Sequence, residues 1–460
     1  MSVIPELIAV DALGPHGAYR AHNRLTISDV AGHPLAELSL VPKLFVTRAM
    51  TALHKAKTLP LEDRLAALTK AGKLFATGVV NGMPAADHQY LVSRISGTPL
   101  PIVRRAVEAI ERLATGAYDS AQQARPIGAV NDWRDPQAQR GTAIWVRRGN
   151  VFAIHAPGNH PAVASVCLEP LALGYRVAIR PSRREPLSQY RLISVLRACG
   201  FGDDQVVLLP TDYDAAGEIL RQADLSMVYG GQEVIDKYAA NPMVLPNGPG
   251  RSKILLTADA DWRSSLDMIV ASISHEGGTA CVNTTAVFVE GDPTPVAEAI
   301  AERLAAIPSL PPENEQAVLT AYSLQAAKKI EGYLLAKAAG TRAHLGGDGV
   351  VDELGDGSAV LRPAVHQLDN PNAPQANIEL AFPCVWVAPW TREAGIAPLK
   401  HTLVLTAVTR DEELLDELLT EPTIKNLYIG NHPTYWMEPG IPHDGYLGEF
   451  LMRTKAVIRD

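Results

Sequence analysis

The sequence is poor in the features that mark several large classes of protein. Only four of its 460 residues are cysteine, at 167, 199, 281 and 384, and without a CxxC pair they indicate neither a zinc site nor a disulfide framework. No apolar run approaches the ~20 residues that a membrane-spanning helix needs. The N-terminus lacks the basic region and the apolar stretch of a signal peptide. We therefore expect a cytoplasmic protein with free thiols and no membrane span.

An excess of basic charge is also lacking. The formal net charge is −8, with 47% hydrophobic and 20% charged residues, a composition typical of globular proteins. Such a charge gives no electrostatic footprint for nucleic acid, so we expect no nucleic-acid partner. A chain of 460 residues is too long for one hydrophobic core, which predicts two or three domains.

Strand-like and helix-like segments alternate from residue 151 onwards. The strand-like runs cover 151–154, 176–179, 206–209 and 225–229, and the helical runs cover 162–173, 188–199, 215–223 and 230–238. This alternation is typical of a parallel sheet with helices on both faces. It continues from residue 252, where 266–273, 295–306 and 315–338 are predicted helices. Ligands bind such sheets at the carboxyl ends of their strands.

The first 120 residues carry less information. Residues 1–45 resemble an irregular or hairpin-like lead-in, and 47–114 are predominantly helical. Pro60 suits a first helical position, and four apolar residues then share one helical face, namely Leu61, Leu65, Leu68 and Phe75. Residues 102–113 form a second amphipathic helix, and 455–458 are strand-like.

Cys281 lies in a run of small residues, HEGGTACVNTT, between a predicted helix and a predicted strand. Small neighbours let a substrate carbon approach the sulfur, and cysteine is the best side-chain nucleophile near neutral pH. A buried structural thiol is the alternative interpretation. Histidines at 155, 160 and 275 are candidate bases for Cys281, although their spacing does not require this role.

Three turns at the ends of predicted strands carry polar or flexible residues. Asn159, in PGNHP, is placed to donate a hydrogen bond to a developing negative charge or only to satisfy its turn. The sequence RPSRR at 180–184 suits a phosphorylated ligand, or is a solvated basic loop. Gly230 and Gly231 allow a backbone to approach a pyrophosphate at a helix N-terminus, without a GxGxxG fingerprint.

Seven segments in this order resemble the aldehyde dehydrogenase superfamily, from about residue 140 to the C-terminus. They are HAPGNHP, RVAIRPSRREP, DLSMVYGGQEVIDKY, NGPGRSKILLTADAD, GGTACVNTTAVFV, IELAFPCVWV and YLGEFLMRTKAVIRD. There is also some likeness to CoA-acylating aldehyde dehydrogenases and fatty acyl-CoA reductases. The resemblance implies an α/β fold of two Rossmann-like parallel-sheet domains with a small β oligomerisation element.

The same resemblance implies a division of the chain. Residues 1–120 would be the lead-in and helices of the cofactor domain, 121–150 an oligomerisation hairpin and 151–252 the dinucleotide-binding domain. Residues 253–430 would form the catalytic domain, and 431–460 a C-terminal oligomerisation strand. A homodimer or homotetramer is expected, because the family pairs its final strand across subunits.

The resemblance also assigns roles to residues. Cys281 would attack the aldehyde, Asn159 would hold the oxyanion with the Cys281 backbone N–H, and hydride transfer to the nicotinamide would leave a thioester. Transfer of the acyl group to a second nucleophile would then release an acid or an acyl product. In reverse, the same steps would reduce an acyl thioester to an aldehyde. The cofactor-binding residues would be Arg180, Ser182, Arg183, Gly230, Gly231 and Phe382.

The sequence departs from the family pattern at three positions. Asn247 replaces the general-base glutamate, which favours transfer to the thiol of coenzyme A, because a thiol needs less activation than water. Glu276 is a possible substitute base, which keeps hydrolysis open. Arg183 replaces the ribose-binding glutamate, which favours NADP, with NAD as the alternative. Leu380 replaces a glutamate that contacts the nicotinamide ribose, although Glu379 precedes it.

Three functions follow as hypotheses. The first is an NAD(P)-dependent oxidoreductase that interconverts an aldehyde and an acyl thioester with coenzyme A as co-substrate. The second is a hydrolytic aldehyde dehydrogenase that forms a carboxylic acid. The third is a non-redox cysteine acyltransferase, or an inactive dinucleotide-binding scaffold, which the changes at Asn247 and Leu380 keep open.

Overall fold

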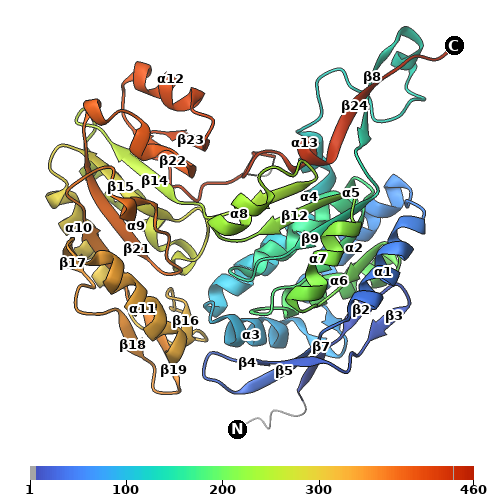
Figure 1. The fold of residues 1–460 in the computed structure, drawn as a ribbon, viewed down its shortest axis with the longest axis horizontal. Helices are drawn as coiled ribbons and strands as arrows, with labels where there is room; N and C mark the ends of the chain where they lie inside the picture. The colour runs from blue at the N-terminus through green and yellow to red at the C-terminus, as the bar shows by residue number, and fades with distance from the viewer. Residues whose placement is uncertain (1–6, 439) are drawn as a thin grey trace.

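The computed structural model describes residues 7–438 and 440–460, and the first six residues of the predicted lead-in lie outside it. Two seven-stranded sheets build two halves that face each other across the middle of the molecule (Figure 1). The predicted α/β organisation with two mainly parallel sheets is confirmed.

The first sheet has the strand order β13-β12-β9-β10-β11-β2-β3. The five strands β9 to β13 are parallel to one another. Strand β2 is antiparallel to them and pairs with β11. All of the strands predicted between residues 151 and 229 belong to it. The bounds are β2 (Ala12–Gly14), β3 (Gly17–Tyr19), β9 (Val151–His155), β10 (Arg176–Arg180), β11 (Val206–Leu208), β12 (Leu225–Tyr229) and β13 (Val244–Asn247).

Helices cover both faces of this sheet, because alternate residues of each strand point to opposite sides. Phe152 and Ile154 of β9 pack towards α2, α4, α5 and α6, whereas Val151 and Ala153 pack towards α1 and α7. The helices are α1 (Lys43–Lys55), α2 (Leu61–Thr77), α3 (Ala85–Ser96), α4 (Leu100–Gln122), α5 (Leu168–Ala172), α6 (Leu187–Leu196), α7 (Tyr213–Gln222) and α8 (Gln232–Tyr238).

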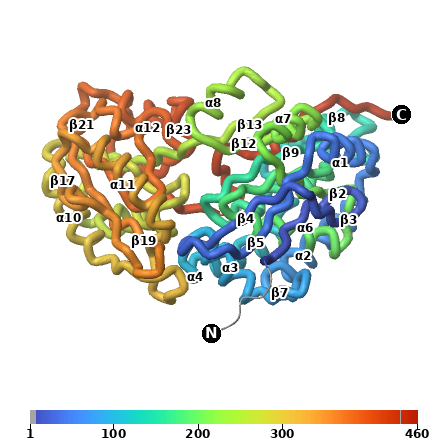
Figure 2. Tube along the Cα trace, turned by 60° about the horizontal axis from the view of Figure 1, so that its bottom comes forward, coloured from blue at the N-terminus to red at the C-terminus, as the bar shows by residue number. Residues whose placement is uncertain are grey.

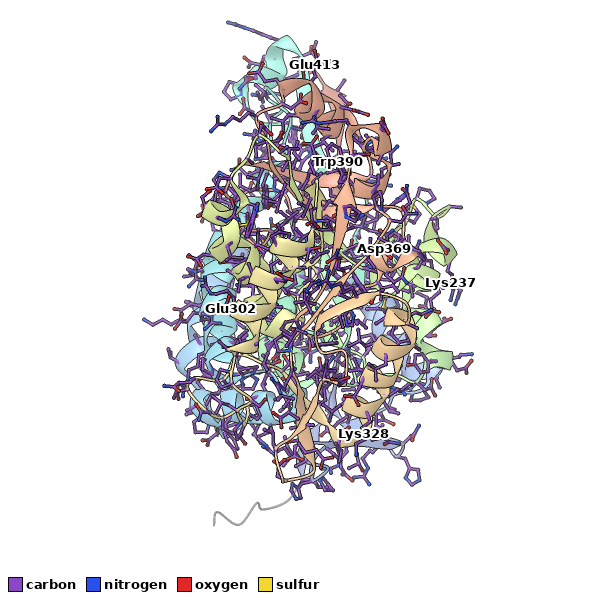
Figure 3. The ribbon with its side chains drawn as sticks, turned by 90° about the vertical axis from the view of Figure 1, so that its left-hand side faces the viewer. Lys237, Glu302, Lys328, Asp369, Trp390 and Glu413 are labelled. Atoms are coloured by element: carbon purple, nitrogen blue, oxygen red, sulfur yellow. The ribbon has the colours of Figure 1, made fainter. Side chains whose placement is uncertain are left out.

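The second sheet has the order β17-β20-β21-β15-β14-β22-β23, with β17 antiparallel at its edge. Helices α9 and α10 cover one face and α11 and α12 the other. Figure 3 shows Trp390 inside this half, where it is 1% exposed, while Glu302, Lys328 and Glu413 lie on exposed helix surfaces. The bounds are β14 (Ser252–Leu256), β15 (Thr284–Glu290), β17 (Arg342–Leu345), β20 (Ala364–Gln367), β21 (Cys384–Trp390), β22 (Thr402–Val408), β23 (Ile424–Ile429), α9 (Leu266–Ser274), α10 (Thr294–Ala305), α11 (Leu324–Ala338) and α12 (Glu412–Thr420).

Smaller β elements surround the two halves. A two-stranded antiparallel ribbon of β8 and β24 extends away from the body beside the C-terminus (Figure 1). Figure 2 shows β4 and β5 running across the near side of the first half towards the second. The bounds are β1 (Ile8–Val10), β4 (Arg24–Ser28), β5 (Pro34–Ser39), β6 (Val79–Val80), β7 (Met83–Pro84), β8 (Thr142–Arg147), β16 (Ala321–Ser323), β18 (Val351–Glu353), β19 (Ser358–Leu361), α13 (Leu447–Leu451) and β24 (Met452–Val457).

Several predicted elements were wrong in extent. The predicted helix 315–338 contains a loop and strand β16 before α11 begins, and the first part of 162–173 is a 3-10 helix. The predicted helix 102–113 is part of the longer α4, whose small residues pack on α2. Pro60 caps α2 rather than occupying its first turn, and Leu61 is 36% exposed. Among the described residues, no helix is long and apolar enough to cross a membrane.

Arg94 of α3 joins the two halves through carboxylates from both. Its guanidinium lies 2.8 Å from Asp29, beside the first half, and 2.5 Å from Glu313 and 3.5 Å from Asp356 in the second. Burial lowers the pKa of Arg94, but Asp29 and Glu313 outweigh it and raise the pKa above its usual range. The side chains of Arg94 and Asp29 are only 10% and 6% exposed, so this ion pair is shielded from most of the surrounding water.

We predict that Arg94→Ala destabilises the protein by roughly 3 kcal/mol, because it leaves the buried Asp29 carboxylate without its partner. Thermal unfolding followed by circular dichroism measures the change. Arg104→Ala is the matched control, since the Arg104–Glu315 pair is exposed and should contribute less than about 1 kcal/mol. Equal shifts for both variants would contradict the prediction.

Candidate active site

The segment between α9 and β15 carries Cys281 and turns sharply before reaching it. Glu276, Gly277 and Gly278 all have positive φ, at 48°, 75° and 71°. A Cβ atom on Gly278 would lie 2.3 Å from the Pro383 nitrogen, so only glycine fits both the backbone conformation and the space. The glycines of the sequence motif therefore shape this turn.

Hydrogen bonds then fix the segment from Cys281 to β15. The side-chain oxygen of Asn283 accepts from the Ala280 N–H at 2.8 Å, and its amide donates to the His275 carbonyl at 2.9 Å. Ser252 donates to the Cys281 carbonyl at 3.1 Å. Gly250 also lies against this carbonyl, since an added Cβ would come within 1.7 Å of the oxygen. The backbone of Cys281 is therefore held in one place.

Cys281 differs from the other cysteines in its surroundings. Cys167 and Cys384 are fully buried, and burial raises the pKa of both thiols, that of Cys167 to about 12. These two thiols are inert at neutral pH. Cys281 is only half-buried, and its sulfur faces an imidazole at close range.

That imidazole belongs to His443, whose Nε2 lies 3.5 Å from the Cys281 sulfur. Its other ring nitrogen, Nδ1, lies 3.1 Å from a carboxylate oxygen of Asp444. Asn426 of β23 donates to the His443 carbonyl at 2.5 Å, which ties the loop to the second sheet. Thiol, imidazole and carboxylate thus form a connected chain, the arrangement of nucleophile, base and orienting group that activates a nucleophile.

The charges around His443 favour its protonated form. Burial lowers the pKa of this imidazole, but the hydrogen bonds and negative charges of Asp444 and Cys281 outweigh burial and raise the pKa above its usual value. The neighbourhood of the ring therefore favours an imidazolium at His443.

Asn159 reaches the same segment from the first half. It lies in the turn after β9, and its amide donates to the Thr279 carbonyl at 3.2 Å. An amide carries two N–H donors, so this contact leaves one for another acceptor. The structure thus brings Asn159 into contact with Thr279, which is two residues before Cys281 in the chain.

Asn247 is 7% exposed at the end of β13, opposite Tyr229 of β12. Burial raises the pKa of the Tyr229 hydroxyl. The nearby charges of Asp444 and Cys281 raise this pKa further, whereas Asn247 lowers it. A neutral amide and a neutral phenol therefore occupy the place where sequence comparison expects a carboxylate.

Glu276 is engaged with another histidine. Nε2 of His160 lies 2.7 Å from its carboxylate, and Nδ1 of the same ring accepts from the Ala162 N–H. Burial raises the pKa of Glu276, but the neighbouring His160 outweighs burial and holds the pKa below its usual value. A carboxylate held in this way is a weak base.

The three histidines considered from the sequence have other contacts. His160 faces Glu276, and His275 stacks on Tyr435 with a centroid separation of 3.8 Å. Burial, with the charge of Arg180 next in size, lowers the pKa of His155 to about 3. The sulfur of Cys281 is hydrogen bonded instead to a histidine that sequence reasoning missed.

Arg180 and Arg183 lie together at the carboxyl end of β10. Both donate to Thr211, and their guanidinium carbons lie 5.6 Å and 4.9 Å from the Tyr213 ring centroid. Burial, then the charge of Arg183, lowers the pKa of Arg180. Two cations beside an aromatic ring that is 81% exposed suit an anionic ligand.

The remaining predicted cofactor residues differ in how much open space surrounds them. Ser182 lies against Gly158, where an added Cβ would be 2.2 Å from the serine oxygen, and Gly231 at the start of α8 has open space around it. Gly230 instead abuts Val234. Phe382 is 2% exposed within the core of the second half, so the structure does not bring its ring to an open surface.

His443, Asp444 and Tyr229 are the site residues that sequence reasoning missed. His443 lies 162 positions after Cys281, in a Pro- and Gly-rich loop without regular periodicity. Its only sequence signal is an adjacent His-Asp pair in that loop. Glu379, which the sequence places before Leu380, accepts from the Arg251 N–H at 2.8 Å.

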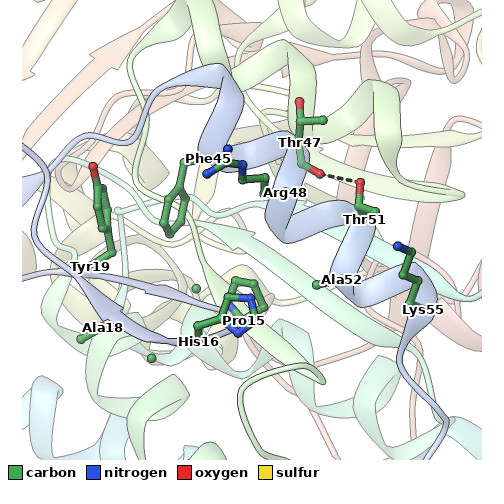
Figure 4. Close-up of a pocket in the computed structure, with 12 residues that line it drawn as sticks. Pro15, His16, Ala18, Tyr19, Phe45, Thr47, Arg48, Thr51, Ala52 and Lys55 are labelled. Carbon is green, nitrogen blue, oxygen red and sulfur yellow. Dashed lines mark hydrogen bonds between the residues drawn. The ribbon is translucent and has the colours of Figure 1, made fainter.

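A hollow of about 610 Å³ lies elsewhere, between the β2–β3 hairpin and α1. Figure 4 shows Tyr19 and Phe45 on one side of it, and Arg48 and Lys55 along the helix. Because β3 is the edge strand furthest from β13, this hollow is separate from the site around Cys281.

The chain matches the model of the aldehyde dehydrogenase family over residues 20–399. Malonate-semialdehyde dehydrogenase 2 of Bacillus mycoides (strain KBAB4) is 26% identical over 163 residues, which are 34% of this chain and 33% of that protein. Aspartate-semialdehyde dehydrogenase 1 of Pseudomonas canavaninivorans is 23% identical over 209 residues, 44% of this chain and 43% of that protein. The chain thus spans less than half the length of these curated relatives.

Solved structures share the fold over nearly the whole chain. An indole-3-acetaldehyde dehydrogenase complexed with NAD+ has a TM-score of 0.81 at 17% identity, covering 99% of this chain and 98% of that chain. An NAD-dependent aldehyde dehydrogenase from Sinorhizobium meliloti has a TM-score of 0.81 at 18% identity, with 99% and 95% covered. A 3,6-anhydro-L-galactose dehydrogenase in complex with NAP has a TM-score of 0.80 at 18% identity, with 97% and 99% covered.

We predict that Gly250→Ala displaces the Cys281 backbone and slows alkylation of this thiol by iodoacetamide roughly tenfold. The reason is that a small displacement of a reacting group is enough to lower its reaction rate strongly. Mass spectrometry of the Cys281 peptide gives the rate. Gly217→Ala is the matched control, since nothing lies within 4 Å of an added Cβ at that position in α7. An unchanged alkylation rate in Gly250→Ala would contradict the proposed backbone constraint.

Proposed function

This chain belongs to the aldehyde dehydrogenase family, and we propose that it is an NAD(P)-dependent oxidoreductase that interconverts an aldehyde and an acyl thioester. The observation that carries the proposal is the half-buried Cys281 sulfur beside His443, on a segment that Asn159 also contacts. These three side chains come from loops of both halves. They supply a nucleophile, a proton acceptor and an amide donor.

Each of these residues has a role in the proposed reaction. Cys281 attacks the aldehyde carbon, and the free N–H of Asn159 with the Cys281 backbone N–H stabilises the resulting oxyanion. A nicotinamide cofactor, when bound, supplies the acceptor for the hydride. The acyl group then stays on Cys281 as a thioester until an acceptor removes it.

The basic cluster of Arg180 and Arg183 supports NADP as the cofactor, with NAD as the alternative. The two guanidinium groups lie beside Tyr213 with Thr211 as their hydrogen-bond partner. Their mutual repulsion is relieved by a dianionic 2′-phosphate. Ser182, Gly230 and Gly231 would contact the rest of the cofactor, whereas Phe382, whose ring is buried, would support the site from behind without a direct contact.

Coenzyme A is the acceptor that we propose for the acyl group. Asn247 cannot remove a proton from water, and the Glu276 carboxylate is already paired with His160. A thiol ionises several units below water and so needs a weaker base. Hydrolysis is the second candidate, because His443 lies close enough to the thioester sulfur to serve a water molecule as well.

Homo-oligomerisation is proposed through the ribbon of β8 and β24. Within the described part of the chain β24 pairs with β8, β8 adds only an isolated bridge to Val130, and most side chains of β24 are exposed. Isolated two-stranded ribbons are marginally stable, which favours pairing with another subunit. The four free cysteines suit a reducing compartment, so the cytoplasm remains the proposed location.

The function is tested with a panel of aldehydes and both cofactors, with and without coenzyme A. We expect NAD(P)H formation that coenzyme A accelerates by an order of magnitude or more, because the thiol is the better acceptor. Cys281→Ala should be inactive, whereas Cys199→Ala should retain activity. Turnover that is indifferent to coenzyme A would favour hydrolysis, and the absence of any absorbance change would support a non-redox role.

The cofactor preference is tested with Arg183→Glu. A carboxylate at this position should repel a 2′-phosphate and accept from a ribose 2′-OH, so the ratio of kcat/KM for NADP over NAD should fall about a hundredfold. Arg410→Glu, at an exposed position after β22, makes the same charge change away from the site. A clear NAD preference in the wild type would refute the assignment of this arginine.

A further inference from the structure

The loop between β23 and α13 brings an imidazole to the reacting sulfur. Position 247, where the family has its general-base glutamate, carries an asparagine and supplies no carboxylate. His443 Nε2 is 3.5 Å from Cys281, and Asp444 holds Nδ1 at 3.1 Å. Asn426 fixes the His443 carbonyl. An imidazole tied at its backbone and at one ring nitrogen presents its other nitrogen in a defined direction.

We propose that His443 is the proton-transfer residue of this site: it takes the proton of Cys281 before acylation and the proton of the acyl acceptor afterwards, with Asp444 as its positioning residue. This proposal deepens the function proposed above and rests on it. It replaces the missing base at Asn247 with a residue from a distant part of the chain.

The hydrogen-bond partners of the ring determine its tautomer. A carboxylate only accepts hydrogen bonds, so the Nδ1 atom that faces Asp444 carries a proton. In the neutral ring Nε2 is then an acceptor, and it is this atom that faces the sulfur. After taking the thiol proton, the imidazolium lies between two anions, the thiolate and the Asp444 carboxylate.

The Cys281 thiolate adds to the aldehyde, and hydride leaves the carbon for the oxidised nicotinamide cofactor that the proposed function names, which gives a thioester and reduced cofactor. His443 then no longer faces a thiolate and releases its proton to solvent. The neutral ring takes the proton of the acceptor thiol, which attacks the thioester, and the Cys281 thiolate leaves beside the new imidazolium.

The titratable groups that bear on this ring within the described residues come from the loop itself, the cysteine segment and β12. Asp444 and Cys281 contact it directly, and Tyr229 of β12 interacts with both of them. Tyr229 is neutral at working pH because burial and these two charges raise its pKa. Tyr229 therefore adds no titration of its own near neutral pH, and the pH dependence of the site is assigned to His443 with Asp444 and Cys281.

The first test uses the full-length protein without substrate or cofactor. Iodoacetamide is applied over a range of pH, and modification of the Cys281 peptide is followed by mass spectrometry. We expect His443→Gln to slow the reaction roughly tenfold at neutral and mildly acidic pH and to change its pH profile, because a nearby cation favours thiolate. His432→Gln, an exposed histidine of the same loop, should behave like the wild type.

The second test separates the two proton transfers in turnover. His443→Gln should lower both the burst rate of NAD(P)H and the later steady-state rate by about a hundredfold, within the range for general bases. Added imidazole should partly restore both rates in His443→Ala, which a merely structural role would not allow. Asp444→Asn should give a smaller loss and a shifted pH profile.

The outcomes distinguish this proposal from the function on which it rests. If the wild type forms no NAD(P)H with any substrate, the proposed function fails, but the alkylation profile still reports on His443. If His443→Gln folds, as judged by its melting temperature, and keeps the wild-type alkylation profile and turnover rates, the assignment of His443 is overturned. Failure of imidazole to restore His443→Ala would likewise contradict it.

Discussion

The contact between the Cys281 sulfur and the His443 imidazole is the interaction on which this site depends. Each partner is ordinary when taken alone. Together, with Asp444 behind the imidazole, they place a nucleophile beside a base at a half-buried position, where the low dielectric strengthens their interaction. Every role proposed for neighbouring residues assumes a sulfur that is nucleophilic before acylation and a good leaving group afterwards.

Two remote segments and the turn before Cys281 together hold that contact. Gly250, in the segment entering β14, admits the Cys281 carbonyl, and Gly278 allows the turn before it. Asn159 approaches from the other half and bonds to the Thr279 carbonyl. The Arg94 cluster joins the halves away from this point. The site is therefore a property of both sheets and of their relative position, and not of the cysteine loop alone.

The sequence allowed much of the scaffold to be predicted, because buried parallel strands leave continuous apolar runs. Val151 to Ile154 and the strands after it were placed correctly for this reason. Helix extents were less predictable, as at α4, where small residues such as Ala114 and Ala117 are buried against α2 without a strong apolar pattern. Strand β16 was missed because its three residues pair with β19, a contact that no local signal reports.

At the site, the nucleophile and the amide donor were recognisable because each lies in a motif of fixed local geometry. His443 was not recognisable, because its position beside Cys281 results from long-range folding of an irregular loop. The most direct measurement of the central claim is mass spectrometry of the protein after reaction with an aldehyde and oxidised cofactor in the absence of coenzyme A. We predict an acyl mass increase on the Cys281 peptide that disappears when coenzyme A is added; an unmodified Cys281 accompanied by reduced cofactor would contradict the account.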